Sequence, residues 1–281
     1  MKALVRPGRR LPDHPLLEPV AGSLEDRSSL ETLVAGCRAV VHVAGAITGT
    51  NYAELARVNV AGTRRLVVAM SERSPDARLV HVSSLAAREP ALSDYAASKR
   101  AGEDVVTLSA LDWIILRPPA VYGPDDPALA SLWRWLSRGW LLRPGPSEAR
   151  FSLLHVDDLA AALLAAALPD QRQAAVVCLD DGRRGGYDWA SLVDIAERRR
   201  GGAVRVLPIP RPLLSFAAAC GLMMARPSLI RTPVLVPGKV RELAHPDWVC
   251  DNTALPGCPD WTPRKRLEDC LGTLPGWEKT R

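Results

Sequence analysis

The chain has few of the features that mark several common protein classes. Its six cysteines are widely spaced and form no Cys-x-x-Cys pair, so we expect reduced thiols in a cytoplasmic protein, without structural zinc or another metal. The first residues show no signal peptide. The longest apolar stretches, residues 159–168 and 213–225, are too short to span a bilayer. The second could lie on a membrane surface, but packing on a core or lining an apolar pocket is the favoured interpretation.

Positive charge is in excess but is not concentrated. The net charge is +5, yet the arginines are scattered along the chain and do not gather with aromatic residues. This pattern argues against a nucleic-acid partner. With 47% hydrophobic and 24% charged residues in a chain of 281, the composition is that of a globular protein that buries one large core or two modest ones.

Apolar runs alternate with helical patterns over the first part of the chain. Continuous apolar runs are typical of strands that are buried on both faces of a sheet. Their alternation with helices predicts right-handed crossovers, and therefore an α/β fold with a Rossmann-like, doubly wound parallel sheet. The predicted strands are residues 39–44, 78–82 and 113–117, with weaker ones at 2–6 and 17–21, and the predicted helices are 28–33, 51–70 and 93–108.

Three of these strands deliver small or polar residues to one edge of the sheet. Gly45, Ser84 and Pro118 each follow the carboxyl end of a predicted strand. In open parallel sheets, ligands bind outside the carboxyl ends of the strands. We therefore predict the binding site at this edge.

A phenol and an ammonium are neighbours in the predicted helix 93–108. Tyr95 and Lys99 are four residues apart, which places both side chains on one helix face. A nearby cation lowers the pKa of a phenol and lets it act as a general base nearer to neutral pH. Ser84 could hold a substrate oxygen beside them. Taken alone, Tyr-x-x-x-Lys also occurs by chance on solvated helix faces.

The alternation stops beyond Gly123. The stretches 139–145 and 207–212 are expected to be loops. Residues 153–168 are expected to form a strand and a helix that return to the sheet, with Asp157 or Asp158 capping the helix.

This change in pattern predicts two domains. Residues 1–125, joined by about 153–180, would form the core that contains the sheet. Residues 126–281 would form mainly a smaller lobe over the edge of the sheet.

Five motifs, taken in order, resemble the extended short-chain dehydrogenase/reductase family, also called the NAD-dependent epimerase/dehydratase family. The resemblance runs over almost the whole chain. The motifs are His42-Val-Ala-Gly45 with Val58-Asn59-Val-Ala-Gly62-Thr63, Val82-Ser-Ser84 with Tyr95-x-x-x-Lys99, Arg117-Pro-Pro-Ala-Val-Tyr-Gly-Pro124, His155-Val-Asp-Asp-Leu159, and Asp260-Trp-Thr-Pro263 with Leu267-Glu-Asp269.

The resemblance implies a role for each matching residue. Tyr95 would be the general acid or base on a substrate hydroxyl or carbonyl, and Ser84 would orient the substrate oxygen. Lys99 would hold the nicotinamide ribose and lower the pKa of Tyr95, and hydride would pass between the substrate carbon and the nicotinamide. The backbone around the cofactor cleft would be shaped by Ala44, Gly45, Pro118 and Val121, with turn geometry as the alternative explanation.

Other matching residues would have structural roles. Asn59 would fix the catalytic helix. His155 and Asp157 would stabilise the joint between the domains.

The chain departs from the family pattern at its beginning. The family starts with a strand and Gly-x-x-Gly-x-x-Gly, whose bare backbone lets a pyrophosphate sit on a helix N-terminus. Here residues 2–6 resemble the second strand of the family, and no such glycine motif precedes Gly45. Two explanations stay open: a start assigned too late or a truncated chain, whose native form carries the missing strand, or a shortened protein that binds dinucleotide poorly.

Substrate and cofactor expectations rest on a few positions. Sugar-nucleotide epimerases of the family bind diphosphate with an arginine at the position of Phe151, so a sugar nucleotide is not favoured. The apolar stretch 213–225 suits a hydrophobic alcohol or ketone. Basic residues after the strand 2–6, namely Arg6, Arg9 and Arg10, favour NADP over NAD, with an exposed basic loop as the alternative.

Two classes of function follow. The leading hypothesis is an NAD(P)-dependent oxidoreductase or epimerase of a small, hydrophobic substrate, because Ser84, Tyr95 and Lys99 are all retained. The rival is a non-catalytic scaffold or nucleotide-sensing subunit of the same fold, like the accessory subunit of respiratory complex I, since the glycine loop is missing. The long helices 51–70 and 93–108 could pair two subunits as a homodimer.

Overall fold

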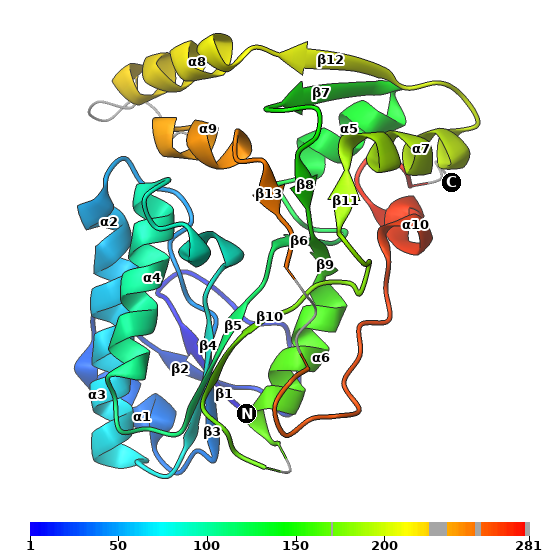
Figure 1. Ribbon diagram of the computed structural model, residues 1–281. Helices are drawn as coiled ribbons and strands as arrows, with labels where there is room; N and C mark the ends of the chain where they lie inside the picture. The colour runs from blue at the N-terminus through cyan, green and yellow to red at the C-terminus, as the bar shows by residue number, and fades with distance from the viewer. Residues whose placement is uncertain (170, 225–234, 251–253, 279–281) are drawn as a thin grey trace.

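The computed structural model describes residues 1–169, 171–224, 235–250 and 254–278. Its centre is a parallel four-stranded sheet in the order β10-β5-β4-β3 (Figure 1). Every residue of β4 is buried. The strands are β3 (Ala39–His42), β4 (Arg78–Val82), β5 (Trp113–Arg117) and β10 (Ala175–Cys178), so the predicted α/β fold with a parallel sheet is confirmed.

The two N-terminal strands form a separate sheet. β1 (Lys2–Val5) pairs in parallel with β2 (Glu18–Ala21), and neither is hydrogen-bonded to the four-stranded sheet. Among the described residues, no strand pairs with β3 on the side away from β4. Val41 of β3 is accordingly 41% exposed. The sheet is thus interrupted where the sequence pattern lacks the first strand of the family.

Helices cover both faces of the four-stranded sheet because neighbouring residues of β4 point to opposite sides. Leu79 packs with Leu66 and Met70, whereas Val80 packs on the other face with Ala162. Figure 1 shows the first four helices on one side and α6 on the other. The helices are α1 (Arg27–Val34), α2 (Tyr52–Ala56), α3 (Thr63–Arg73), α4 (Asp94–Thr107) and α6 (Val156–Ala167), with a π-helical segment, Arg57–Gly62, between α2 and α3 and a 3-10 turn at Leu85–Arg88.

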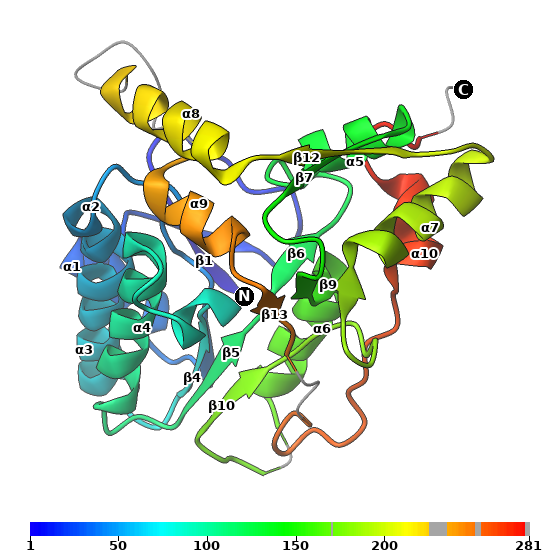
Figure 2. The same cartoon turned by 45° about the horizontal axis from the view of Figure 1, so that its top comes forward.

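The rest of the chain builds a second region around Tyr122, Trp133 and Tyr187, all of which are buried (Figure 2). The strands of this region are short. They are β6 (Ala120–Tyr122), β7 (Trp140–Pro144), β8 (Arg150–Phe151), β9 (Leu153–His155), β11 (Tyr187–Asp188), β12 (Arg205–Ile209) and β13 (Asp247–Trp248). The helices are α5 (Ala130–Ser137), α7 (Trp189–Arg200), α8 (Arg211–Met224), α9 (Pro237–Leu243) and α10 (Leu267–Cys270), followed by a 3-10 turn at Leu271–Thr273.

Two stretches expected to be loops are structured. Residues 140–144 and 205–209 pair as the parallel strands β7 and β12, and α8 begins at Arg211. Proline has no backbone N–H, so it is tolerated in a strand that has no hydrogen-bonded neighbour on one side. Among the described residues, β7 and β12 pair only with each other, so each strand has such a side. The prediction from proline content was therefore wrong here.

The cap of α6 also differs from the prediction. The helix begins at Val156, and its N-cap is His155, whose Nδ1 accepts a hydrogen bond from the backbone N–H of Asp157 at 3.1 Å. Asp157 and Asp158 lie in the first turn instead, where negative charge is favourable to the helix dipole.

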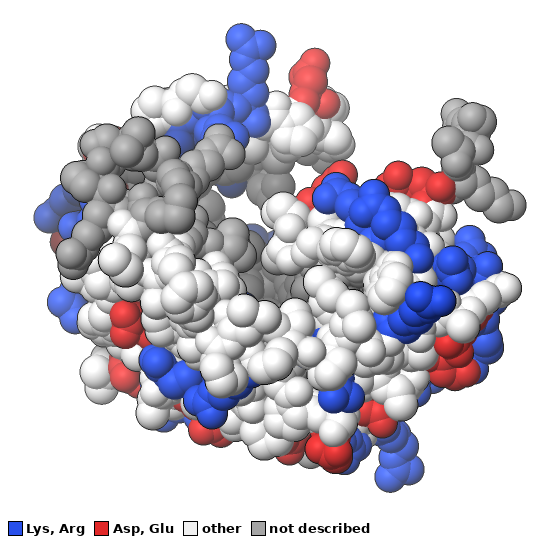
Figure 3. All heavy atoms as spheres, turned by 90° about the horizontal axis from the view of Figure 1, so that it is seen from above, with Lys and Arg blue, Asp and Glu red and all other residues white. Residues whose placement is uncertain are grey.

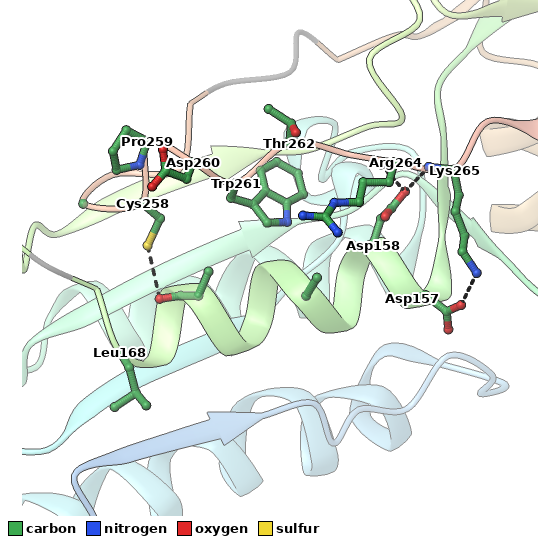
Figure 4. Close-up of a pocket in the computed structure, with 13 residues that line it drawn as sticks. Asp157, Asp158, Leu168, Cys258, Pro259, Asp260, Trp261, Thr262, Arg264 and Lys265 are labelled. Atoms are coloured by element: carbon green, nitrogen blue, oxygen red, sulfur yellow. Dashed lines mark hydrogen bonds and ion pairs between the residues drawn. The ribbon is translucent and has the colours of Figure 1, made fainter.

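A hollow of about 540 Å³ lies along α6 and is closed by the segment 257–265 (Figure 4). The Asp158 carboxylate accepts backbone N–H groups of Arg264 and Lys265 at 3.0 and 2.8 Å. Cys258 donates to the carbonyl of Ala165 at 3.2 Å. These bonds attach the C-terminal segment to α6, and the hollow contains none of the predicted catalytic residues.

Candidate active site

Helix α4 carries the predicted catalytic residues Tyr95 and Lys99, and it begins directly after its N-cap, Ser93. Ser93 has extended backbone, and its side chain accepts the N–H of Ala96 at 2.9 Å, which satisfies a free donor of the first turn. Tyr95 and Lys99 then lie one turn apart, as the spacing predicts. Lys99 is 6% exposed and Tyr95 is half-buried, so this is not a solvated helix face.

Ser84 meets Tyr95 at the carboxyl end of β4. Its extended backbone follows the strand, and its hydroxyl accepts the N–H of Ala86 at 3.2 Å. The hydroxyl of Ser84 lies close enough to the Tyr95 phenol to lower its pKa. Pro118 closes the same corner, since its carbonyl accepts the N–H of Leu85 at 2.8 Å. Two hydroxyl groups thus stand together at the predicted edge.

The pKa of Tyr95 is raised rather than lowered. Burial raises it most, the neighbouring hydroxyl of Ser84 lowers it, and the carboxylate of Glu242 raises it further. The expected lowering by Lys99 is absent because the Lys99 ammonium turns away to donate to the carbonyl of Val82 at 2.8 Å. At neutral pH the phenol is therefore protonated and is a proton donor.

Lys99 stands beside the bare backbone of Gly45. Burial lowers the pKa of Lys99 to about 8, opposed by the nearby carboxylate of Glu103. A Cβ at position 45 would lie 3.5 Å from Nζ of Lys99 and 3.3 Å from Oδ1 of Asn59. Ala44 and Gly45 are both exposed. An open backbone next to a buried cation fits a nicotinamide ribose, so these residues suit the cofactor that the family pattern implies.

Asn59 links this loop to the catalytic helix. Its Oδ1 accepts the N–H of Ala46 at 2.7 Å, and its Nδ2 donates to the Ala46 carbonyl and to Oγ of Ser98, each at 2.9 Å. Asn59 lies in the π-helical segment and is buried. The predicted structural role of Asn59 agrees with these contacts.

Two predicted cofactor residues stand apart from this group. Val121 packs against the apolar cluster of α6 and β9. Arg6 is exposed at the end of β1, in the separate sheet. No contact among the described residues joins either side chain to Ser84, Tyr95 or Lys99.

Sequence analysis missed a buried carboxylate at the site. Glu242 of α9 is 6% exposed, and its carboxylate accepts the hydroxyl of Ser93 and the ammonium of Lys239, the latter at 3.0 Å. Helix α9 is thereby fastened to the start of the catalytic helix. No motif marks Glu242, because its significance comes from a contact with a distant part of the chain.

A pair of buried histidines beneath the site was also missed. His42 and His81 are opposite each other in β3 and β4, with ring centroids 5.2 Å apart. Burial lowers the pKa of His42 to about 4 and that of His81 well below its ordinary value. Both rings are therefore neutral at physiological pH. Their positions in two neighbouring strands were visible in the sequence, but their register was not.

Known proteins are similar to this chain in sequence. The family model described as "NAD dependent epimerase/dehydratase family" matches residues 4–177, more than half of the chain. Ceramide reductase of Caulobacter vibrioides (strain NA1000 / CB15N) is 40% identical over 246 residues, which are 85% of this chain and 76% of that protein.

Solved structures are similar in fold. The structure described as MoeE5 in complex with UDP-glucuronic acid and NAD has a TM-score of 0.70 at 21% identity, covering 98% of this chain and 89% of that chain. RMD from Pseudomonas aeruginosa, complexed with NADPH, has a TM-score of 0.66 at 18% identity, covering 96% and 93%. The family model and the sequence relative agree with the motifs around Ser84, Tyr95 and Lys99. The chain therefore belongs to the NAD-dependent epimerase/dehydratase family.

Proposed function

We propose that the protein is an NAD(P)H-dependent reductase that converts a ketone of a lipid-like substrate into an alcohol. The observation that carries this proposal is the neighbouring hydroxyls of Ser84 and Tyr95, on the same corner of the sheet as the buried ammonium of Lys99. A bound reduced nicotinamide supplies the hydride to the carbonyl carbon. Ser84 holds the carbonyl oxygen, and Tyr95 donates its proton to that oxygen. The ketone thereby gains one hydride and one proton and becomes an alcohol.

The protonated phenol favours reduction. A general acid must carry its proton before the reaction, and the raised pKa of Tyr95 keeps it there at neutral pH. The ammonium of Lys99, beside the bare backbone of Gly45, can hold the ribose hydroxyls. The tyrosinate then recovers a proton from solvent.

A lipid ketone fits better than a sugar nucleotide. The relative with 40% identity is a ceramide reductase. At the position where sugar-nucleotide enzymes of the family carry arginine, Phe151 is stacked on Tyr187 and lies against the tilted ring of Trp189, with ring centroids 6.3 and 5.1 Å away. The neighbouring Arg150 donates to the carbonyl of Gly185 instead. We propose an oxidised, ceramide-like lipid as substrate.

Tyr95→Phe tests the reaction because it removes only the hydroxyl. We expect the rate of nicotinamide oxidation with a ketone form of ceramide to fall about 10²-fold or more. Tyr52→Phe, at a 42% exposed tyrosine of α2, is the matched control and should keep the parental rate.

Equal rates in the parent and in Tyr95→Phe would refute the assigned proton donor. Nucleotide binding without turnover of any ketone would instead favour the nucleotide-sensing or scaffold role.

For the cofactor we propose NADPH rather than NADH. Arg6 is exposed at the carboxyl end of β1 and has no ion-pair partner among the described residues, so its guanidinium is available for a 2′-phosphate. We expect Arg6→Ala to raise the KM for NADPH about tenfold and to leave that for NADH unchanged, as steady-state kinetics with both cofactors would measure. A parent enzyme that uses NADH equally well or better would contradict this preference.

A further inference from the structure

One face of the molecule exposes large apolar side chains in a row. On α8, Leu213, Phe216 and Met223 are 57%, 68% and 76% exposed. Their spacing of three and seven residues places them on one side of the helix. We call these three residues, together with Leu207 of β12, the apolar face.

The other side of α8 is already covered. Ala218 is fully buried, and α8 packs against α9. A helix that is apolar on all sides is normally buried on all sides. On its outward side, α8 therefore has no element of the described residues packed over these three side chains.

The strand before α8 continues this surface. Leu207 of β12 is 45% exposed. Strand β12 leads directly into α8, and the two run along the same side of the molecule in Figures 1 and 2. Figure 3 looks onto this side and shows a broad area without charged residues, bordered by both basic and acidic side chains.

The charge of this part of the chain has one sign. Between Glu197 and Glu242 the sequence contains no Asp or Glu, but nine Lys and Arg. Two of them flank the apolar face: Arg211 begins α8, and Arg205 of β12 has its guanidinium 5.3 Å from the ring centroid of Trp140. Asp194 and Glu197 of α7 line a hollow with Val206, which points to the opposite side of β12 from Leu207. Apolar side chains flanked by Arg205 and Arg211 match the acyl chains and anionic headgroups of a membrane surface.

We propose that the apolar face docks on the surface of an anionic bilayer, with Leu213, Phe216 and Met223 entering the region between headgroups and acyl chains. A second copy of the chain is a poorer occupant, because two identical basic surfaces would repel each other. This attachment is peripheral: no helix of the described residues is long and apolar enough to cross a membrane.

Docking would bring the bilayer close to the candidate active site. Helix α8 contacts α9, and Glu242 of α9 accepts the hydroxyl of Ser93 at the start of the catalytic helix. A lipid substrate would then have a short path from the bilayer to Tyr95. The docking itself does not depend on the proposed reaction, and it can be measured without turnover.

Cosedimentation of the protein with lipid vesicles tests the proposal. We expect binding to vesicles of phosphatidylcholine with phosphatidylglycerol, weaker binding to phosphatidylcholine alone, and weaker binding at high salt. The double variant Leu213→Ser/Phe216→Ser should bind the anionic vesicles more weakly, by about tenfold at least. Leu108→Ser, at an 87% exposed leucine that ends α4, is the matched control and should bind like the parent.

Folding and oligomeric state are checked alongside. Circular dichroism and thermal unfolding of both variants should match the parent, since all three changed side chains are exposed. Absence of parental binding to the anionic vesicles would overturn the proposal, as would parental binding by the double variant. A parental dimer that becomes a monomer in the double variant, without vesicle binding by either, would assign the face to a second copy instead.

Discussion

At the scale of single residues, Lys99 gives the site its pH dependence. Its pKa is lowered to about 8 by burial, whereas that of Tyr95 is raised. The cation that would hold the nicotinamide ribose is therefore lost as the pH rises through about 8, and we expect kcat/KM to fall above that pH.

A pH–rate profile of Lys99→Arg checks this assignment. Arginine stays charged in this range, so the alkaline limb should move to higher pH even if the rate itself is lower. An unchanged alkaline limb would assign the titration to another group. The effect on stability has the opposite sign: between pH 8 and 10.5 the unfolded chain binds a proton that folded Lys99 does not, so stability rises with pH.

The sequence predicted which side chains meet, but not their electrostatics. Tyr95 and Lys99 share a helix face because of a four-residue spacing, and Ser84 reaches them because strand ends meet at one edge. The direction of the Tyr95 pKa shift was wrong, since it depends on burial and on Glu242, which belongs to a distant helix. Spacing is local information, whereas desolvation depends on the whole fold.

At the scale of elements, the catalytic helix and the π-helical segment approach closely at Gly102. A Cβ on Gly102 would lie 2.5 Å from the backbone carbonyl oxygen of Asn59. Alanine normally stabilises a helix by about 1 kcal/mol relative to glycine. Here the clash involves backbone and should outweigh that gain, so we expect Gly102→Ala to destabilise the protein by about 1–3 kcal/mol.

Urea unfolding measures this effect, and activity shows whether α4 has moved. Ala101→Gly, one position earlier in α4, is the control: it should cost about 1 kcal/mol through helix propensity and leave the activity intact. A Gly102→Ala protein more stable than the parent would show that the two elements can separate without cost.

Elements with strong local signals were predictable. The expected bounds of α4 match because Ser93 is a capping residue followed by a clear helical period. The strand β7 and its partner β12 were missed, since Pro208 and Pro144 suggested loops and the pairing joins distant segments. The cap of α6 was misplaced because His155, an unusual N-cap, precedes two aspartates that are common ones.

At the scale of the whole molecule, the two N-terminal strands lie in a smaller sheet than β4 and β5 and have fewer hydrogen-bonded neighbours. β1 and β2 have only each other as hydrogen-bonded strands and are held mainly through contacts with α1. Two-stranded sheets are marginal without such support. We expect amide protons of β1 and β2 to exchange with solvent about a hundredfold faster or more than those of β4 and β5.

Hydrogen–deuterium exchange read by mass spectrometry would resolve these segments. Peptides of β10, at the other edge of the four-stranded sheet, provide the comparison for an ordinary edge strand. Equal protection of β1 and β4 would show that the two sheets open as one unit.

The overall architecture followed from the alternation of apolar runs and helical patterns, whereas the interruption of the sheet followed only from the family resemblance. The second region could not be predicted in the same way. Its strands are as short as the two residues of β8, β11 and β13, and periodicity cannot be recognised over so few positions. The division into domains stays a prediction.

The side of β3 that faces away from β4 is able to pair with a strand of another molecule. Its backbone donors and acceptors on that side have no strand partner among the described residues, and Val41 and Val43 are 41% and 57% exposed. Such an edge can template pairing with an extended segment of another chain, and proteins often suppress this with a lysine in the edge strand. A protein of residues 1–281 alone should therefore aggregate through β3 in concentrated solution, and Val41→Lys should keep it dispersed.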